Sequence, residues 1–198
     1  MAEAIRDFLG ENARLIASFI LLFMLFIPIG VVCYHAYPSI SSLVIQYTKM
    51  KASKTAALAA NKPVLRALLI FRNNAKVVAT MVSLGITGIV PVAIIAGNGL
   101  VLGMIVEYVR ASGLGITAVI LSIVPHGIIE VPGICIAAAG GFRWFLEIVK
   151  GKGSFSERLV RGLRSAVVGF LISLLLLAIA ALVEAYITPP AHANVVHA

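Results

Sequence analysis

Long apolar runs constrain this chain more than any other feature of its sequence. Residues 15–33 are 19 consecutive positions without a charged side chain, and residues 167–187 contain only one, Glu184. Each run is long enough for a helix to cross a hydrocarbon core about 30 Å thick. Hydrophobic residues make up 61% of the chain and charged residues 12%, a composition that excludes a soluble catalytic domain and a nucleic-acid-binding module. We therefore predict an all-α polytopic membrane protein, with one membrane domain over residues 1–198.

The stretch that starts at residue 77 is apolar again, but glycine and proline interrupt it. We predict a second span over residues 77–95, ended by a Gly-Asn-Gly turn at residues 97–99. Residues 100–109 are too few to cross the bilayer as an upright helix. They are predicted to be either a short crossing or a re-entrant half-helix.

Residues 114–145 form an apolar stretch that is too long for one span. Pro125 and Pro132 interrupt its middle, which predicts two half-length segments joined by a broken helix at residues 125–133. Such a turn is stable at membrane depth only where protein or a water-filled cavity satisfies its backbone groups. With a last span at residues 166–188, the chain would have five or six membrane segments.

Basic residues gather on two connections between the spans, residues 34–76 and residues 146–165. Of the 16 lysines and arginines, seven lie at residues 49–76 and six at residues 143–164. The positive-inside rule then predicts that both connections are cytoplasmic, and that the N- and C-termini lie outside a cell membrane that the chain crosses several times. The net charge of +8 is explained by this topology, so no nucleic-acid partner is expected.

The first basic connection combines its charge with a helical apolar pattern. No acidic residue occurs within residues 34–76. Part of this connection is predicted to lie as an amphipathic helix on anionic lipid, and a solvated basic loop is the alternative. The apolar residues with this spacing are Ile40, Leu43, Val44, Tyr47 and Met50.

Few ionisable residues fall inside the apolar segments. Each costs at least about 2.5 to 3.5 kcal/mol at the centre of a bilayer, so each one is a candidate functional residue. These residues are Glu107, His126, Glu130 and Glu184, and the polar neighbours at the segment ends are Asn73, Asn74 and Asn98.

His126 and Glu130 are four residues apart, which places both on one face of a helix that starts at Pro125. Pro132 removes a backbone hydrogen bond beside them. By the predicted topology this segment faces the outer side, where Glu184 also lies near the end of the last span. We therefore predict that the three ionisable groups converge in one outward-facing pocket.

Three interpretations of this pocket remain open. It can be a structural hydrogen-bonded network, a site for a divalent metal such as zinc or manganese, or a site for conducting protons or a substrate. An intramembrane metal-dependent hydrolase is the enzymatic version of the second interpretation. The chain lacks the His-Glu-x-x-His pattern that would supply two ligands and a general base, so a non-enzymatic role is favoured.

Small residues indicate where helices approach closely. Gly99 and Gly103 form a Gly-x-x-x-Gly pair, which predicts tight internal packing or a seam between copies in a homo-oligomer. Gly127 lies between Pro125 and Pro132 in the predicted broken helix, and all three are assigned a structural role.

Several of these motifs together resemble the stage II sporulation protein M family. They are Phe-Arg-Asn-Asn at residues 71–74, Asn-Gly at residues 98–99 with Gly103, Pro-His-Gly-Ile-Ile-Glu-Val-Pro at residues 125–132, and Val-Glu-Ala-Tyr-Ile-Thr-Pro at residues 183–189. The resemblance covers about residues 65 to 190. The segment at residues 125–132 is its most specific element.

The resemblance implies a polytopic membrane protein in which the His126, Glu130 and Glu184 positions belong to a shared polar signature. The member that gives the family its name is a scaffold for cell-wall hydrolases, but the family also includes archaeal proteins. We therefore expect a scaffold that contacts other membrane proteins. A transporter or channel that uses the same pocket is the alternative, and it predicts a polar path through Glu107 or Asn98. A metal-dependent hydrolase ranks third.

Overall fold

The structure is a computed structural model, and it describes residues 2–113 and 116–187. Within these residues the chain forms α1 (Ala2–Ala36), α2 (Pro38–Leu58), α3 (Pro63–Ser83), α4 (Ile89–Ala111), α5 (Ile116–Lys150) and α6 (Phe155–Tyr186), with a 3₁₀ turn at Gly85–Thr87. Four stretches are long and apolar enough to cross a membrane, namely Glu3–Ala36, Ile89–Ala111, Ile123–Lys150 and Phe155–Tyr186. The predicted class, an all-α polytopic membrane protein, is confirmed.

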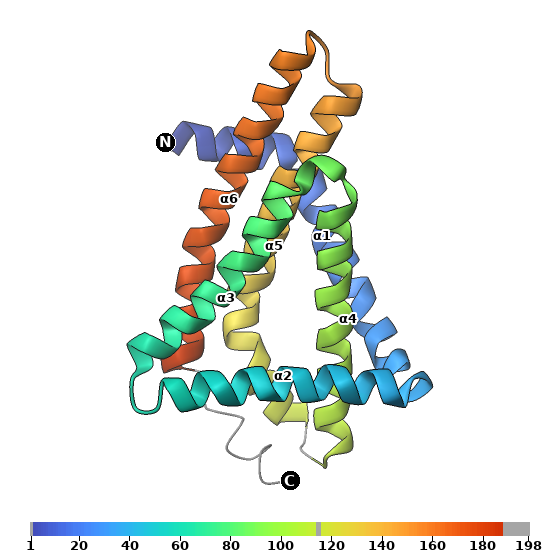
Figure 1. Cartoon of the computed structure of the whole chain (residues 1–198), viewed down its shortest axis with the longest axis vertical. Helices are drawn as coiled ribbons and strands as arrows, with labels where there is room; N and C mark the ends of the chain where they lie inside the picture. Colours follow the sequence, from blue (N-terminus) through green and yellow to red (C-terminus); the bar gives the residue numbers. More distant parts are fainter. Residues whose placement is uncertain (1, 114–115, 188–198) are drawn as a thin grey trace.

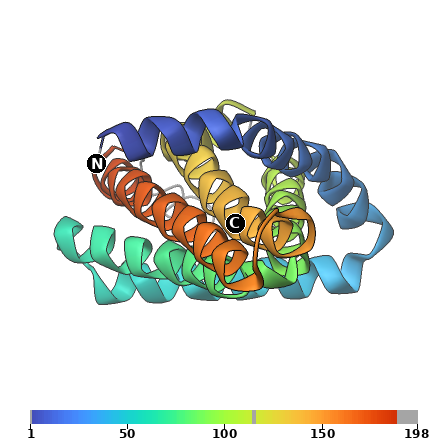
Figure 2. The same cartoon turned by 90° about the horizontal axis from the view of Figure 1, so that it is seen from above.

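Five of the helices run between two ends of the molecule, and α2 lies across one of them (Figure 1). We call this the α2 end, and we call the opposite one, which carries the turn between α5 and α6, the α5–α6 end. Helix α1 starts near the α5–α6 end and runs to the α2 end, α3 returns, α4 descends, α5 rises and α6 descends (Figures 1 and 2). The closest pairs of helices are α5 with α6 and α1 with α4.

The core lies where α1, α3, α4, α5 and α6 meet. Its largest fully buried side chains include Met81, Ile95 and Leu177, and Phe19 and Phe23 of α1 pack against them. Apolar residues elsewhere on the helices are widely exposed, as expected of surfaces that face lipid.

Glycines let α1 and α4 approach with backbone in contact. A Cβ atom on Gly99 would overlap the carbonyl oxygen of Phe23, and one on Gly103 would overlap that of Ile27. Gly30 on α1 faces Leu100 in the same way. The Gly-x-x-x-Gly pair thus lies where α4 packs tightly against another helix of the same chain.

The predicted boundary between the second and third membrane segments is wrong. The reversal occurs at the 3₁₀ turn and Gly88, whose φ of 71° is the left-handed conformation that favours glycine. Pro91 stands in the first turn of α4, where a missing N–H costs no helical hydrogen bond. Residues 97–99 continue the helix instead of forming a turn. Residues 100–109 are consequently part of a full 23-residue helix, neither a short crossing nor a re-entrant half.

The predicted division of residues 114–145 into two segments is also wrong within the residues that the structure describes. Helix α5 is continuous from Ile116 to Lys150 although Pro125 and Pro132 lie inside it. The two prolines each remove one backbone donor, and the lower part of α5 bends (Figure 1). The prolines thus bend the helix without ending it.

The basic connections are more helical than predicted. Helix α2 occupies about half of the first connection, and α3 begins within it at Pro63. Ile40, Leu43, Tyr47 and Met50 are all exposed on α2, as an amphipathic helix at a membrane surface requires. In the second connection α5 extends to Lys150, and α6 starts with a capping box in which Ser154 and Glu157 bond each other's backbone N–H.

The two basic connections lie at opposite ends of the molecule (Figure 1). Helices α3, α4 and α5 separate them along the chain, and α4 and α5 of these are candidate membrane spans. The cytoplasmic placement of both connections and the outer placement of both termini stay predictions.

Candidate functional site

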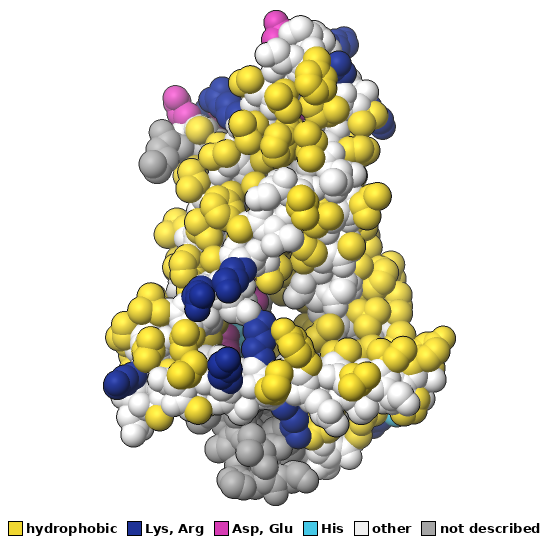
Figure 3. Space-filling model, in the orientation of Figure 1, with side chains coloured by type: hydrophobic (Ala, Val, Ile, Leu, Met, Phe, Trp, Pro, Cys, Tyr) yellow, Lys and Arg dark blue, Asp and Glu magenta, His cyan; other side chains and the backbone are white. Residues whose placement is uncertain are grey.

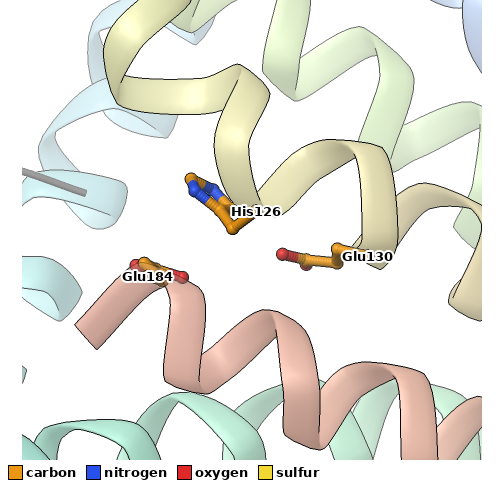
Figure 4. Close-up of side chains that lie close together, drawn as sticks. All are labelled: His126, Glu130 and Glu184. Carbon is orange, nitrogen blue, oxygen red and sulfur yellow. The ribbon is translucent and has the colours of Figure 1, made fainter. Parts of the chain in front are cut away.

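Helices α5 and α6 bring the three predicted ligands together. His126 and Glu130 lie one turn apart on α5, and Glu184 lies in the last turn of α6 (Figure 4). One ligand atom from each residue, an imidazole nitrogen or a carboxylate oxygen, lies within 4.8 Å of the other two. All three residues are half-buried. The predicted convergence is therefore seen in the structure.

The three residues lie at the α2 end, beside the first basic connection. They line a cavity of about 300 Å³ to which α2 and α3 contribute the other side. That this cavity faces the outer side of a membrane stays a prediction. The polar residues that complete the lining are Thr48, Lys51, Thr55, Arg66, Asn73 and Asn74.

The paired asparagines on α3 reach into this site. Asn74 Nδ2 donates to Glu130 Oε1 at 3.1 Å, and Asn73 Nδ2 donates to Asn74 Oδ1 at 3.3 Å. One donor thus orients the Glu130 carboxylate, and its other oxygen atom and lone pairs remain available for a ligand. The asparagine pair that the sequence marked as a polar motif positions a site residue.

Lys51 and Arg66 are lining residues that the sequence reasoning did not single out. They belong to α2 and to the first turn of α3. Desolvation, together with the positive charge of Lys76, holds the pKa of the Lys51 ammonium below its usual value of 10.5. No sequence pattern distinguishes these two cations from the other basic residues of the connection. They line the cavity only because the turn between α2 and α3 brings the two helices side by side.

Glu107 is not part of this site. It is buried near the end of α4, where His35 Nε2 lies 2.7 Å from its Oε1 atom. Arg110 donates to both carboxylate oxygens, from Nε at 2.8 Å and from Nη2 at 2.6 Å. Glu107 therefore has its charge and its hydrogen bonds satisfied within the protein.

Asn98 lies on a second cavity, between α3 and α4. Its Nδ2 donates to the carbonyl oxygen of Ile94 at 2.7 Å. This cavity measures about 450 Å³ and shares Asn73 with the first one. Lys76 and Thr80 supply the rest of its polar lining. The asparagine pair thus connects the two cavities.

The donor set of the site suits a divalent cation. One imidazole and two carboxylates are ligands that zinc and manganese accept. Tetrahedral ligands at 2.0 to 2.1 Å from zinc are about 3.3 Å apart. The candidate ligand atoms lie within 4.8 Å of one another, so the side chains would have to rotate toward each other to bind zinc. Three protein ligands would leave at least one coordination position that faces the cavity.

Comparison with known proteins gives one match. A family model described as Stage II sporulation protein M matches residues 19–189, a range that includes both asparagines, the Pro125 to Pro132 segment and Glu184. No curated protein and no solved structure matches the chain.

Proposed function

The chain belongs to the stage II sporulation protein M family, and from this premise we propose that it is a non-enzymatic membrane scaffold whose His126, Glu130 and Glu184 side chains bind one divalent metal ion. The observation that carries the proposal is the approach of three potential ligand atoms, from two helices, to within 4.8 Å of one another. Zinc and manganese are the proposed ions, because both accept imidazole and carboxylate ligands.

A metal at this position would have a structural effect. Helix α5 bends beside its two ligands, and α6 contributes Glu184 only in its last turn. An ion shared between them would fix the bent part of α5 against the end of α6. This connection would hold the α2 end in one shape, which a scaffold needs in order to present a constant surface to other membrane proteins.

The proposed partners follow from the surface of α2. Its exposed apolar residues and the lysines at 49–54 favour contact with anionic lipid. We propose that the α2 end is cytoplasmic, because seven basic residues occur at 49–76 without an acidic residue among them. Other membrane proteins, or further copies of this chain, would bind through the exposed apolar helix faces.

Elemental analysis of the purified protein after exhaustive dialysis tests the metal site. We expect about one zinc or manganese ion per wild-type chain and almost none after Glu130→Ala, because two remaining ligands bind a divalent ion weakly. Glu107→Gln is the matched control, since it removes a buried carboxylate at the same end and should leave the metal content unchanged. Metal-free wild-type protein from cells grown with added zinc and manganese would contradict the proposal and leave a hydrogen-bonded network.

A transporter or channel is the second candidate, and a specific observation favours it. Asn73 lines both cavities and donates a hydrogen bond to Asn74, which in turn donates one to Glu130. This arrangement supports the predicted polar path through Asn98, whereas Glu107 is engaged elsewhere. Flux of zinc or manganese into vesicles that contain the wild-type protein, abolished by Asn98→Leu, would favour transport over scaffolding. A hydrolase ranks third, and it would require a water molecule in the open coordination position.

A further inference from the structure

The cavity that holds the three proposed metal ligands has a strongly basic rim. Lys51 and Arg66 line it directly, and Arg72 and Lys76 follow along α3. In the space-filling view, lysine and arginine side chains gather over α2 and α3 around a hollow in which acidic side chains are visible (Figure 3). This face of the molecule is therefore both hollowed and positively charged.

None of these four cations forms a direct ion pair with a carboxylate in the described part of the chain. Within residues 2–113 and 116–187, the ion pairs involve Asp7, Glu107 and Glu147, and none of them includes Lys51, Arg66, Arg72 or Lys76. Desolvation is the main cause of the lowered pKa of Lys51, and the positive charge of Lys76 lowers that pKa further. Lysine and arginine side chains that are not held in ion pairs are free to donate hydrogen bonds to an anion.

The charges inside the cavity identify the kind of anion. Two carboxylates, Glu130 and Glu184, face two cations, Lys51 and Arg66, so the lining is close to neutral before any ion binds. A divalent metal adds two positive charges and presents an open position to the cavity. A ligand with two negative charges would balance the charge of the metal, and its oxygen atoms could occupy the open coordination position. A phosphate monoester has these properties, and arginine and lysine are its usual partners.

We propose that this cavity binds a phosphate monoester group, with one phosphate oxygen on the metal and the others accepting hydrogen bonds from Lys51 and Arg66. This inference rests on the proposed metal site, but the two are tested by different measurements. The group can belong to the headgroup of an anionic lipid or to a soluble phosphate compound. The exposed apolar face of α2 places the cavity near the level of lipid headgroups, where both sources reach it.

Two probes distinguish these sources. Inorganic phosphate is titrated into metal-loaded protein in detergent and followed by calorimetry. Adducts with phosphatidic acid and with phosphatidylcholine are counted by native mass spectrometry. The test variant is Lys51→Gln with Arg66→Gln, and the matched control is Lys152→Gln together with Arg164→Gln, which removes the same charge from positions outside the cavity lining.

We expect the test variant to bind the phosphate probes at least about ten-fold more weakly than the wild type, with the control unchanged, because it removes two charge-assisted hydrogen bonds. Selective adducts with phosphatidic acid would identify a lipid headgroup as the source, and a response to inorganic phosphate alone would identify a soluble ligand. Equal affinity in the test variant and the control, with normal metal content in both, would overturn this inference and leave the metal site intact.

The metal dependence separates the two proposals further. If Glu130→Ala loses the metal and also loses phosphate binding, the phosphate group lies on the metal as proposed. If it loses the metal and keeps full phosphate affinity, the bridging geometry is wrong. Wild-type protein without metal would refute the proposed metal site, and the absence of phosphate binding in that protein would refute this inference as well.

Discussion

Two clusters of histidine and glutamate lie at the α2 end, and they differ in how far the protein satisfies them. Glu107 is bound by His35 and by both nitrogens of a bidentate arginine at 2.6 to 2.8 Å. Glu130 receives one hydrogen bond from Asn74, and Glu184 has no hydrogen bond or ion pair within the described part of the chain. The first cluster is saturated by its own protein, whereas the second retains acceptors that face a cavity.

The packing around the two clusters differs in the same direction. Above the Glu107 cluster, α4 and α1 are in backbone contact at Gly99 and Gly103. Beside His126, a Cβ atom on Gly127 would meet only the side chain of Ile123, at 3.8 Å. A carboxylate in a membrane segment is therefore no sufficient sign of a ligand site. Unsatisfied acceptors beside a loosely packed cavity are a better one.

The largest expected difference between the clusters is their response to metal. Saturating zinc or manganese should raise the melting temperature of the wild-type protein in detergent, because an ion at one hundred times its Kd stabilises the state that binds it by about 2.7 kcal/mol. Glu184→Gln should lose most of this shift, since it removes the only ligand from α6. His35→Gln should keep it. A full shift in Glu184→Gln would place the ion elsewhere.

The second effect concerns the tight packing of α4 against α1. Gly103→Ala should destabilise the protein by about 1 to 3 kcal/mol, because the added Cβ overlaps a backbone oxygen that has little room to move. Gly97→Ala on the same helix is the control, as no atom lies within 4 Å of its Cβ position, and it should be neutral or slightly stabilising. Thermal unfolding in one detergent compares them. Equal melting temperatures would contradict the close contact.

The membrane class and the three residues of the candidate site could be predicted from the sequence. The apolar runs specified the membrane class, and the cost of charge in lipid led to His126, Glu130 and Glu184 before any contact was known. The same cost also made Glu107 a candidate functional residue. Only the folded chain shows that His35 and Arg110 lie beside Glu107 and neutralise its charge. A helical period of four brings His126 to Glu130, but no local rule brings Lys51 or Arg66 to them.

The errors in the prediction have a common physical cause. Gly97, Asn98 and Gly99 have the composition of a turn, yet they continue α4, and Gly99 lies against the backbone of α1. Pro125 and Pro132 have the composition of a break, yet the helix continues past both. Tertiary packing overrode the local preference in each case.

A smaller loss of stability is expected when Glu107 is replaced in its cluster with His35 and Arg110. Glu107→Gln removes a bidentate acceptor, so the melting temperature should fall, but by less than for Gly103→Ala. The side chains of His35 and Arg110 are 60% and 63% exposed, and water can replace the lost partner. Metal content and phosphate binding should not change. A loss of bound metal in this variant would show that the two clusters are coupled.

The least disruptive test checks the arrangement on which the comparison depends. Single cysteines replace Lys54 on α2 and Lys152 in the turn between α5 and α6, in a chain whose Cys33 and Cys135 are changed to serine. Both lysines are exposed, so the substitutions should leave stability almost unchanged. A thiol reagent that does not cross membranes should label only one of the two variants in sealed right-side-out vesicles, and the other only after the membrane is opened. Labelling of both from one side would contradict this expectation and show the even number of crossings that the sequence predicted.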